Sequence, residues 1–406
     1  SKLNLKPDLL IIGAGVSGIT CALKCREYDI DFMLIEKDNR AGGRLGSIYE
    51  GDYIFDIGFQ VFNTSYTITK SFLNLDQLDL RFFKPGALIH QGDCYEIISD
   101  PIRDLGQIFN TIFSNIPTFK DKLKILTLKF SLLNYSLEND FSEDKETRTF
   151  LVDYGFSEKI IDEFFSPFFA GVFLEKKLST SSKFFKYVFS KLSKGLASIP
   201  SNGMQEIPEN MLRGIDRENI LFCSEVEKII SDKKIKLKDG QVFEPKKIIF
   251  TGTSQYLLNK KKVKYNRVKT IYFNTDSKPH NGEYIHIFPQ EKYINNIAFL
   301  TSISNQYTKN KDHLLSVSVI NSDISESELI NHVKQRLQNI YGGNFNFLKY
   351  FDIKQATIYQ PANFLNQQSN WILEDGNYFA GDSMVHSSIE GAVISGIEVM
   401  QKVKKN

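Results

Sequence analysis

The sequence predicts an α/β protein, α+β overall, in which a doubly wound domain is interleaved with a second domain made of an antiparallel sheet and a helical insertion. The apolar runs at 8–12 and 30–35 have the length and composition of strands buried on both faces, and the helical pattern at 16–28 joins them into one βαβ unit. With 406 residues, two or three domains are expected. No repeat or low-complexity linker separates them, which favours interleaving over domains in series.

Helical periodicity dominates from about residue 101 to 195, where apolar residues recur three and four positions apart, as at Ile108, Ile112, Phe113 and Ile116. This stretch is the expected helical insertion. The chain then returns to the first domain through a helix and several strands, in which Asp239-Gly240 closes a hairpin. We expect these elements at 205–213, 221–226, 234–238, 241–243 and 247–250.

A second, mostly antiparallel sheet is predicted from strand-like runs at 270–274, 284–288, 297–302, 314–320 and 345–358. One helix interrupts them, with Ser325 as its N-cap, Glu328 three residues later and Gly342 beyond its end. A strand at 377–380 and a helix at 389–402 complete the chain. The first domain is expected to take residues 1–80, 200–264 and 363–406, and the second residues 81–199 and 265–362.

Composition narrows the classes of function. Lys plus Arg number 50 and Asp plus Glu 48, so the net charge of +2 provides no field that would attract nucleic acid. The four cysteines and six histidines show no metal-ligand spacing, and we expect neither a metal site nor disulfides. Lys2, Lys6 and Asp8 interrupt the first residues, which predicts no signal peptide and a reduced, cytoplasmic protein.

A glycine-rich turn lies between the first strand and its helix. Gly13 allows the tight turn, Gly15 lets the backbone approach a pyrophosphate, and Gly18 lets the helix pack on the strand. Glu36 follows at the end of the second strand, where a carboxylate accepts hydrogen bonds from ribose hydroxyls. Strand, turn, helix and acid together predict dinucleotide binding in a Rossmann-type domain.

The segment after Glu36 distinguishes FAD from NAD. The run 40–47, Arg-Ala-Gly-Gly-Arg-Leu-Gly-Ser, resembles the R-x-G-G-R motif of the superfamily of flavin-dependent amine oxidases, phytoene desaturases and protoporphyrinogen oxidases. Further matches follow in the order of that family. They are Phe55 to Gln60 beside the flavin ring, Pro200 to Met204, Glu225-Val226 beside the adenine, and Ala380 to Gly396 as the C-terminal FAD motif.

The resemblance implies non-covalent FAD, since no cysteine lies near the segments expected at the flavin ring. The residues expected to bind FAD are Gly13, Gly15, Ser17, Gly18, Glu36, Lys37, Gly42, Gly43, Arg44, Gly58, Phe59, Gln60, Val226, Gly381, Asp382, Ser388, Ile389 and Ala392. Lys269 resembles the lysine that holds a water near flavin N5 in many amine oxidases, and is the candidate catalytic residue. A solvated strand face is the alternative for Lys269.

One position, Ser388, indicates which branch of the superfamily the sequence resembles most. Ser388 stands where amine oxidases of this family usually carry an aromatic cage residue, and residues 388–396 are more similar to phytoene desaturases. The 33 Phe gather partly in the runs 164–169 and 184–189, which could line a tunnel for an apolar substrate, touch a membrane surface or pack a core.

The resemblance therefore implies an FAD-dependent oxidoreductase that moves a hydride from a substrate carbon to flavin N5, with oxygen or a quinone as acceptor. A carotenoid-like or porphyrinogen-like substrate is expected, handled by a desaturase, an oxidase or an isomerase. An amine oxidase and a flavin-binding protein without turnover are the alternatives.

Overall fold

The first sheet has five short parallel strands. The computed structural model describes residues 2–98, 119–258, 263–367 and 371–406. In these, the strand order is β10-β2-β1-β14-β20 and every neighbouring pair is parallel. The strands are β10 (Ile220–Leu221), β2 (Phe32–Ile35), β1 (Leu9–Ile12), β14 (Lys247–Thr251) and β20 (Tyr378–Ala380). The predicted doubly wound fold class is confirmed.

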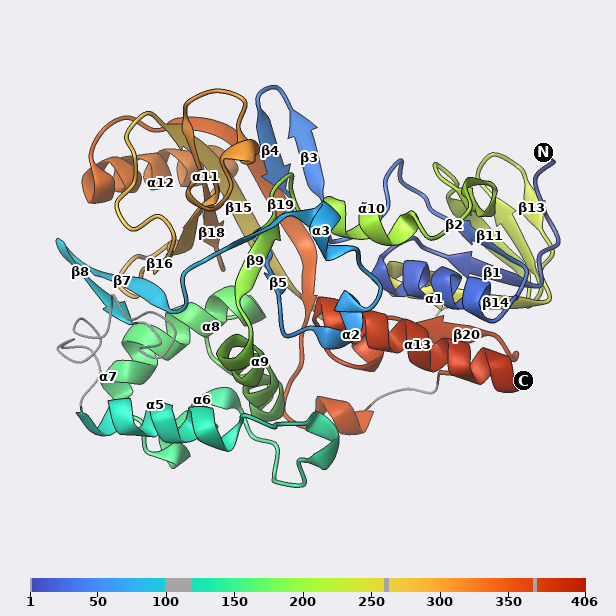
Figure 1. The fold of residues 1–406 in the computed structure, drawn as a ribbon, viewed down its shortest axis with the longest axis horizontal. Helices are drawn as coiled ribbons and strands as arrows, with labels where there is room; N and C mark the ends of the chain where they lie inside the picture. Colours follow the sequence, from blue (N-terminus) through green and yellow to red (C-terminus); the bar gives the residue numbers. More distant parts are fainter. Residues whose placement is uncertain (1, 99–118, 259–262, 368–370) are drawn as a thin grey trace.

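Both faces of this sheet are covered, which is why its strands are apolar throughout. Leu9 and Ile11 face helices of one layer, whereas Leu10 and Ile12 pack on a small antiparallel sheet in the other. Figure 1 shows this domain on the right, with both termini. The helices are α1 (Val16–Glu27), α10 (Glu206–Leu212) and α13 (Ile389–Lys405), and the small sheet is β11 (Val226–Ser231), β12 (Lys234–Leu237) and β13 (Val242–Phe243).

The second sheet has seven strands in the order β19-β15-β18-β17-β16-β7-β8, and its pairs are antiparallel apart from β16 with β7. Helix α12 (Glu326–Tyr341) packs on one face, and Ser325 caps it as predicted by accepting the Glu328 N–H at 3.4 Å. The strands are β19 (Asn346–Ile358), β15 (Tyr265–Thr275), β18 (His313–Val319), β17 (Ile294–Phe299), β16 (Ile285–Ile287), β7 (Ala87–Gln91) and β8 (Cys94–Ile98).

Short elements connect the two sheets. They are β3 (Ser47–Glu50) with β4 (Tyr53–Asp56), the sheet of β5 (Phe62–Asn63), β9 (Ala197–Pro200) and β6 (Leu80–Phe82), and the helices α2 (Thr67–Lys70), α3 (Leu75–Leu78) and α11 (Leu300–Ile303). The strands of the two large sheets alternate along the chain, so neither sheet comes from one continuous segment. The predicted domain boundaries themselves stay predictions.

The helical insertion packs beneath the large sheet (Figure 1) around a cluster of phenylalanines. Its helices are α5 (Phe119–Ser131), α6 (Thr147–Tyr154), α7 (Glu158–Ile160), a π-helical turn (Ile161–Phe165), α8 (Ser166–Phe173) and α9 (Ser182–Lys194). The predicted helical positions Ile108, Ile112, Phe113 and Ile116 lie outside the described residues. Among those described, no helix is long and apolar enough to span a membrane.

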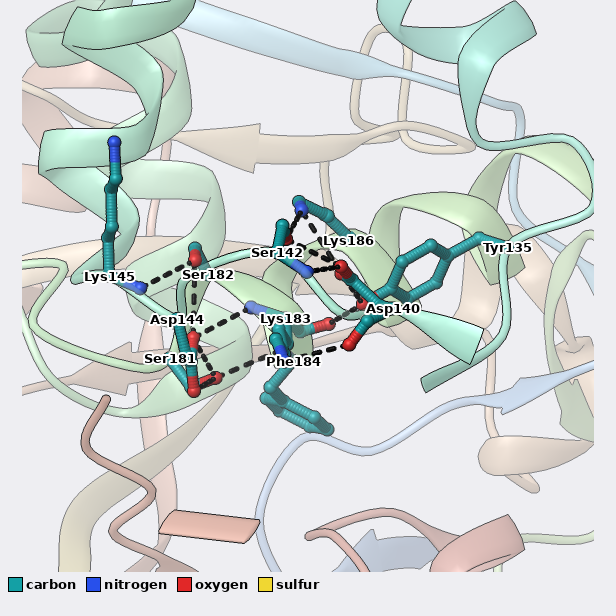
Figure 2. A network of polar contacts seen from close by, with 10 residues as sticks. All are labelled: Tyr135, Asp140, Ser142, Asp144, Lys145, Ser181, Ser182, Lys183, Phe184 and Lys186. Carbon is teal, nitrogen blue, oxygen red and sulfur yellow. Dashed lines mark hydrogen bonds and ion pairs between the residues drawn. The ribbon is translucent and has the colours of Figure 1, made fainter. Parts of the chain in front are cut away.

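Two carboxylates hold the loop before α6 to the start of α9, as Figure 2 shows. Asp144 accepts from the Ser181 hydroxyl at 2.8 Å, and Asp140 accepts from Tyr135 at 2.8 Å and from Lys186 at 3.1 Å. Burial opposes the charge on Asp140, but hydrogen bonds from Ser142, Tyr135 and Lys186 hold the pKa of Asp140 below its usual range. The insertion is therefore tied internally by polar contacts as well as by its aromatic core.

Three sequence predictions of strands were wrong in detail. The strand expected at 221–226 is broken, because Cys223 has φ of +53° and separates β10 from β11. The strand expected at 297–302 ends at Phe299, where α11 begins. No strand was predicted between residues 36 and 101, although β7 and β8 there extend the large sheet. Such pairing depends on partners distant in sequence.

A buried carboxylate joins the small hairpin to the large sheet. Asp56 accepts from Ser47 Oγ at 2.6 Å, from Tyr307 OH at 2.6 Å and from the Met204 N–H at 3.0 Å. Its backbone carbonyl accepts from Tyr272 OH at 2.7 Å. Burial raises the pKa of Asp56 to about 6, although these hydrogen bonds favour the anion.

The raised pKa predicts a pH dependence of stability. The folded chain keeps a proton on Asp56 up to about pH 6, whereas the unfolded chain releases it near pH 4, so this contribution to stability falls as pH rises between those values. In urea unfolding, the wild type should lose up to about 3 kcal/mol of unfolding free energy through Asp56 between pH 4 and pH 8, and Asp56→Asn should not show this loss. The exposed Asp52→Asn is the control. A pH-independent difference between wild type and Asp56→Asn would contradict the prediction.

Candidate active site

The glycine loop between β1 and α1 is closely packed everywhere except at Gly15. A Cβ added to Gly18 would lie 1.8 Å from the Gly13 carbonyl oxygen, and one added to Gly13 would lie 2.3 Å from Thr251 Oγ1. A Cβ on Gly15 would meet no atom of the described part of the chain within 4 Å. Gly15 is the N-cap of α1, and no side chain in the described ranges caps this helix. The open backbone and the free helix N-terminus suit an anionic group.

Glu36 lies at the end of β2, beside this loop, and is buried. Its Oε1 accepts from the Ala14 N–H at 2.9 Å and its Oε2 from the Asp38 N–H at 2.8 Å. Each carboxylate oxygen can accept a second hydrogen bond, so Glu36 can still accept from the two hydroxyls of a diol. The Ser224 N–H donates to the Glu36 carbonyl at 2.8 Å, which brings the segment leading to Val226 to this end of the site.

The second glycine segment lies against the first. Gly42 donates to the Ala14 carbonyl at 2.8 Å and forms a parallel bridge with Gly15. Arg40 holds the segment in place by donating to the carbonyls of Ala41 at 3.1 Å and Leu45 at 3.3 Å. Gly42 has φ of +113° and Gly43 of +59°, conformations in which a side chain is strained.

Arg44 and Asp382 connect the N-terminal and C-terminal motifs directly. Arg44 Nη2 lies 2.7 Å from Asp382 Oδ2, and its guanidinium also stands over the Tyr265 ring at 5.8 Å. Burial opposes the charge, but Asp382 keeps the pKa of Arg44 above its ordinary value. Gln60 donates to the Arg44 carbonyl at 2.9 Å. Three predicted site residues from distant segments therefore meet here.

The C-terminal motif begins α13. Ser388 caps the helix by accepting the Gly391 N–H at 2.9 Å, and its hydroxyl lies 2.9 Å from His386 Nδ1. The Ala392 carbonyl accepts from the Ser17 hydroxyl at 3.1 Å. The Ser17 hydroxyl thus joins α1 to α13. Ser17 would therefore contact a cofactor through its backbone and not through its hydroxyl.

The remaining predicted residues lie around these motifs. Lys37 is exposed just after β2. Phe59 is half-buried with its ring 5.8 Å from Phe83, Gly381 follows β20, and Ile389 is the first residue of α13.

Gly58 lies against the large sheet, with Ile353 of β19 nearest to it and Thr270 of β15 next. Gly58 has φ of +82°, and a Cβ added to it would lie 4.0 Å from Thr270 Oγ1 and 2.9 Å from Ile353 Cδ1. Thr270 is fully buried, and its hydroxyl has no hydrogen-bond partner among the described residues. Leaving such a group unpaired costs about 1–3 kcal/mol. The hydroxyl has no exposed surface, so a bound molecule would reach it only after neighbouring side chains moved aside.

The structure does not bring Lys269 to Gly58. Successive residues of a strand face opposite sides, and Lys269 is paired with Val319 on the face that carries α12. Asp352 lies beside it on the neighbouring strand and accepts from Arg267 at 2.7 Å. This placement agrees with the alternative for Lys269, a strand face near solvent. Thr270 was missed, and only the register of β15 against β18 could have identified it.

His386 is a second residue that sequence reasoning missed. It is buried, and its ring centre lies 4.1 Å from that of Tyr187. Burial lowers the pKa of His386 to about 3, so the ring is neutral and its Nδ1 can accept from Ser388. Its position between Asp382 and Ser388, inside the C-terminal motif, was the available signal.

The phenylalanine runs lie mainly in the core of the insertion. Phe165 and Phe169 are 0% and 1% exposed, and their neighbours are other aromatic rings. The ring centres of Phe169 and Phe185, for example, lie 4.7 Å apart. Core packing, one of the three alternatives considered for these runs, describes Phe165 and Phe169. Neither side chain has the exposed surface that a tunnel wall or a membrane contact needs.

Comparison with known proteins identifies the class. The family model described as flavin containing amine oxidoreductase matches residues 16–403, and the chain belongs to this family. The fold and the site are therefore those of the flavin-containing amine oxidoreductase family, which implies a flavin cofactor.

The curated relatives cover different substrates. Mitochondrial protoporphyrinogen oxidase of Nicotiana tabacum is 27% identical over 166 residues, 40% of this chain and 31% of that protein. The 4,4'-diaponeurosporene oxygenase of Staphylococcus haemolyticus is 29% identical over 115 residues, 25% of this chain and 21% of that one. The chain thus spans less than a third of the length of either relative.

Solved structures share the whole fold at low identity. A putative protoporphyrinogen oxidase from Exiguobacterium sp. 255-15 has a TM-score of 0.74 at 14% identity and covers all of both chains. Putrescine oxidase bound to putrescine has a TM-score of 0.72 at 13% identity, covering 99% of this chain and 100% of that one. At this identity the likeness establishes the fold.

The glycine loop provides a test of the flavin site. Gly15→Ala should leave the melting temperature unchanged, because the methyl group has space and φ of −71° suits alanine, yet it should weaken flavin binding roughly tenfold or more by blocking backbone approach. The measurement is flavin released by acid per polypeptide, with thermal unfolding in parallel. Gly18→Ala is the contrasting variant and should lower the melting temperature. Full flavin content in Gly15→Ala would contradict this placement.

Proposed function

We propose that the chain binds FAD without a covalent bond and oxidises an apolar substrate, carotenoid-like or porphyrinogen-like, by removing a hydride from one of its carbons. Oxygen or a quinone is the proposed acceptor. The observation that carries the cofactor proposal is a line of groups that runs from Glu36 through the open Gly15 to the Arg44–Asp382 pair, where Gln60 bonds to Arg44 and leads to Gly58 and Thr270. These groups suit a ribose, a pyrophosphate, a ribityl chain and a ring in that order.

The positions of the cysteines support dissociable FAD. Cys21 and Cys25 are buried in α1, and burial raises the pKa of the Cys21 thiol to about 12, which keeps it unreactive. Cys94 begins β8 in the second sheet, and the Cys223 N–H donates to the Asp38 carbonyl beside Glu36, at the opposite end of the line from Gly58. None of the four lies where the ring is proposed.

When bound, FAD supplies the isoalloxazine ring that accepts the hydride. The N-terminus of α13, capped by Ser388, would place the positive end of its helix dipole near the ring and favour negative charge there. Gly58 adds no side chain at the proposed ring position, and Thr270 on β15 carries the buried hydroxyl whose role the Thr270→Val variant tests. The proposed reaction requires no nucleophile or metal, because orienting the substrate carbon over the ring accounts for most of the rate enhancement.

The apolar substrate class is supported by two positions and by relatives. Ser388 caps α13 instead of providing an aromatic cage wall, and Thr270, not Lys269, faces Gly58. Protoporphyrinogen oxidase, a diaponeurosporene oxygenase and a hydroxycarotenoid desaturase are among the curated relatives. A flavin-containing monoamine oxidase is also among them, so amines are the substrates to exclude.

Anaerobic mixing with candidate substrates tests this proposal. Carotenoid precursors and porphyrinogens in detergent should bleach the flavin absorbance, and polyamines or primary amines should not. Reoxidation by oxygen and by a quinone is then followed in the same instrument. Bleaching by amines with peroxide release would replace the proposal with an amine oxidase. A flavin that no substrate reduces and that is reoxidised sluggishly after photoreduction would point to a binding protein without turnover.

Thr270→Val tests whether the unpaired hydroxyl serves the bound state. Removing it should stabilise the flavin-free chain by about 1–2 kcal/mol, because a buried unpaired polar group is replaced by a methyl group of similar shape. Flavin affinity or the rate of flavin reduction should fall roughly tenfold, the loss expected for one hydrogen bond. Ser316→Ala, at another buried hydroxyl without a partner, is the control and should affect stability alone. Unchanged binding and reduction in Thr270→Val would remove Thr270 from the site.

A further inference from the structure

Helix α5 carries an apolar stripe on its solvent side. Phe119 is 76% exposed, Leu123 48% and Phe130 60%, with Leu126 half-buried between them. Leu133, just beyond the helix, is 37% exposed. These residues follow one another at intervals of four, three, four and three, so they share one face of the helix. Single exposed apolar residues are ordinary, but a continuous row marks an interaction surface.

The opposite face of α5 is firmly anchored, which fixes the stripe outward. Leu128 and Leu132 are buried in the aromatic core of the insertion. Asp121 accepts from the Ser157 N–H at 2.9 Å and from the Ser157 hydroxyl at 2.6 Å. Figure 1 shows α5 along the lower edge of the insertion, away from both sheets. Rotation of the helix to hide the stripe would break these contacts.

The charges on α5 are almost all positive. Its thirteen residues include four lysines, at 120, 122, 124 and 129, and one acid, Asp121, which is turned inward. Counted at 3.6 residues per turn, Lys120 borders the stripe on one side and Lys122 and Lys129 on the other. Lys124 turns away from the stripe and lies over the Tyr154 ring at 5.5 Å. A row of Phe and Leu bordered by lysines is the arrangement of a helix that lies in the headgroup region of an anionic bilayer.

We propose that α5 is a docking surface for an anionic lipid membrane, with Phe119, Leu123 and Phe130 inserted at the interface and the flanking lysines among the headgroups. The proposal stands on this surface alone and does not depend on the substrate. The membrane contact considered for the runs 164–169 and 184–189 is thereby moved to a different helix, because Phe165, Phe169 and Phe185 are buried in the core.

A second copy of this chain is the competing occupant, since the four-three spacing also suits a helix pair. The lysines argue against it. Two α5 helices packed along their stripes would bring lysines of both copies into the same borders, where like charges repel. An anionic surface meets the same lysines with attraction.

The test is sedimentation of the full chain, loaded with flavin, with vesicles. One set is phosphatidylcholine alone and the other an equal mixture of phosphatidylcholine and phosphatidylglycerol. Wild type should partition to the anionic vesicles, and Phe119→Ser with Phe130→Ser should weaken partition roughly tenfold or more. Lys120→Gln should lose about fivefold, and added salt should also weaken binding.

Phe82→Ser is the matched control, since Phe82 is 47% exposed on β6, outside the insertion. It should bind vesicles as wild type does, and flavin content should be equal in all variants. Absence of wild-type binding to anionic vesicles would overturn the proposal, as would an equal loss in Phe82→Ser. A wild-type dimer that the Phe119 and Phe130 substitutions convert to monomer, without vesicle binding, would assign the stripe to a second copy.

Discussion

The arrangement of this protein depends on one close contact between its first and last helices. A Cβ on Gly396 of α13 would lie 2.8 Å from the Ser17 carbonyl oxygen of α1, so only glycine allows the two backbones to come this near. The Ser17 hydroxyl then bonds to the Ala392 carbonyl and lies 3.0 Å from the Ser395 hydroxyl. This contact seats the C-terminal motif beside the N-terminal glycine loop, although 375 residues separate Ser17 from Ala392.

The polar groups of the site are held in place by the protein before any ligand is considered. Glu36 is fixed by the Ala14 and Asp38 N–H groups, and Arg44 by Asp382 at 2.7 Å. They gather at the carboxyl ends of parallel strands, the edge where α/β sheets bind ligands. Side chains locked by such contacts lose little further freedom on binding, which favours a tightly held dinucleotide.

Strand register decides which side chain reaches the proposed ring position. Lys269 and Thr270 are adjacent, and a shift of one residue in the pairing of β15 with β18 would exchange them. Local sequence around Lys269 is apolar or β-branched on both sides, so it carries no clear signal of which face is which. The same limit applies to phenylalanine: composition located Phe165 and Phe169 in the insertion, but only their contacts assign them to the core.

The sequence by itself determined the features that depend on neighbours in the chain: the βαβ unit, the glycine turn with Glu36, the Ser325 cap and the order of the motifs. Each follows from backbone conformation or periodicity within a few residues. The tertiary structure decided the addition of β7 and β8 to the large sheet, the Arg44–Asp382 pair, the placement of Thr270 near Gly58 and the outward stripe of α5. These depend on contacts between distant segments, whose geometry exists only after packing has chosen the register of each strand and the buried face of each helix.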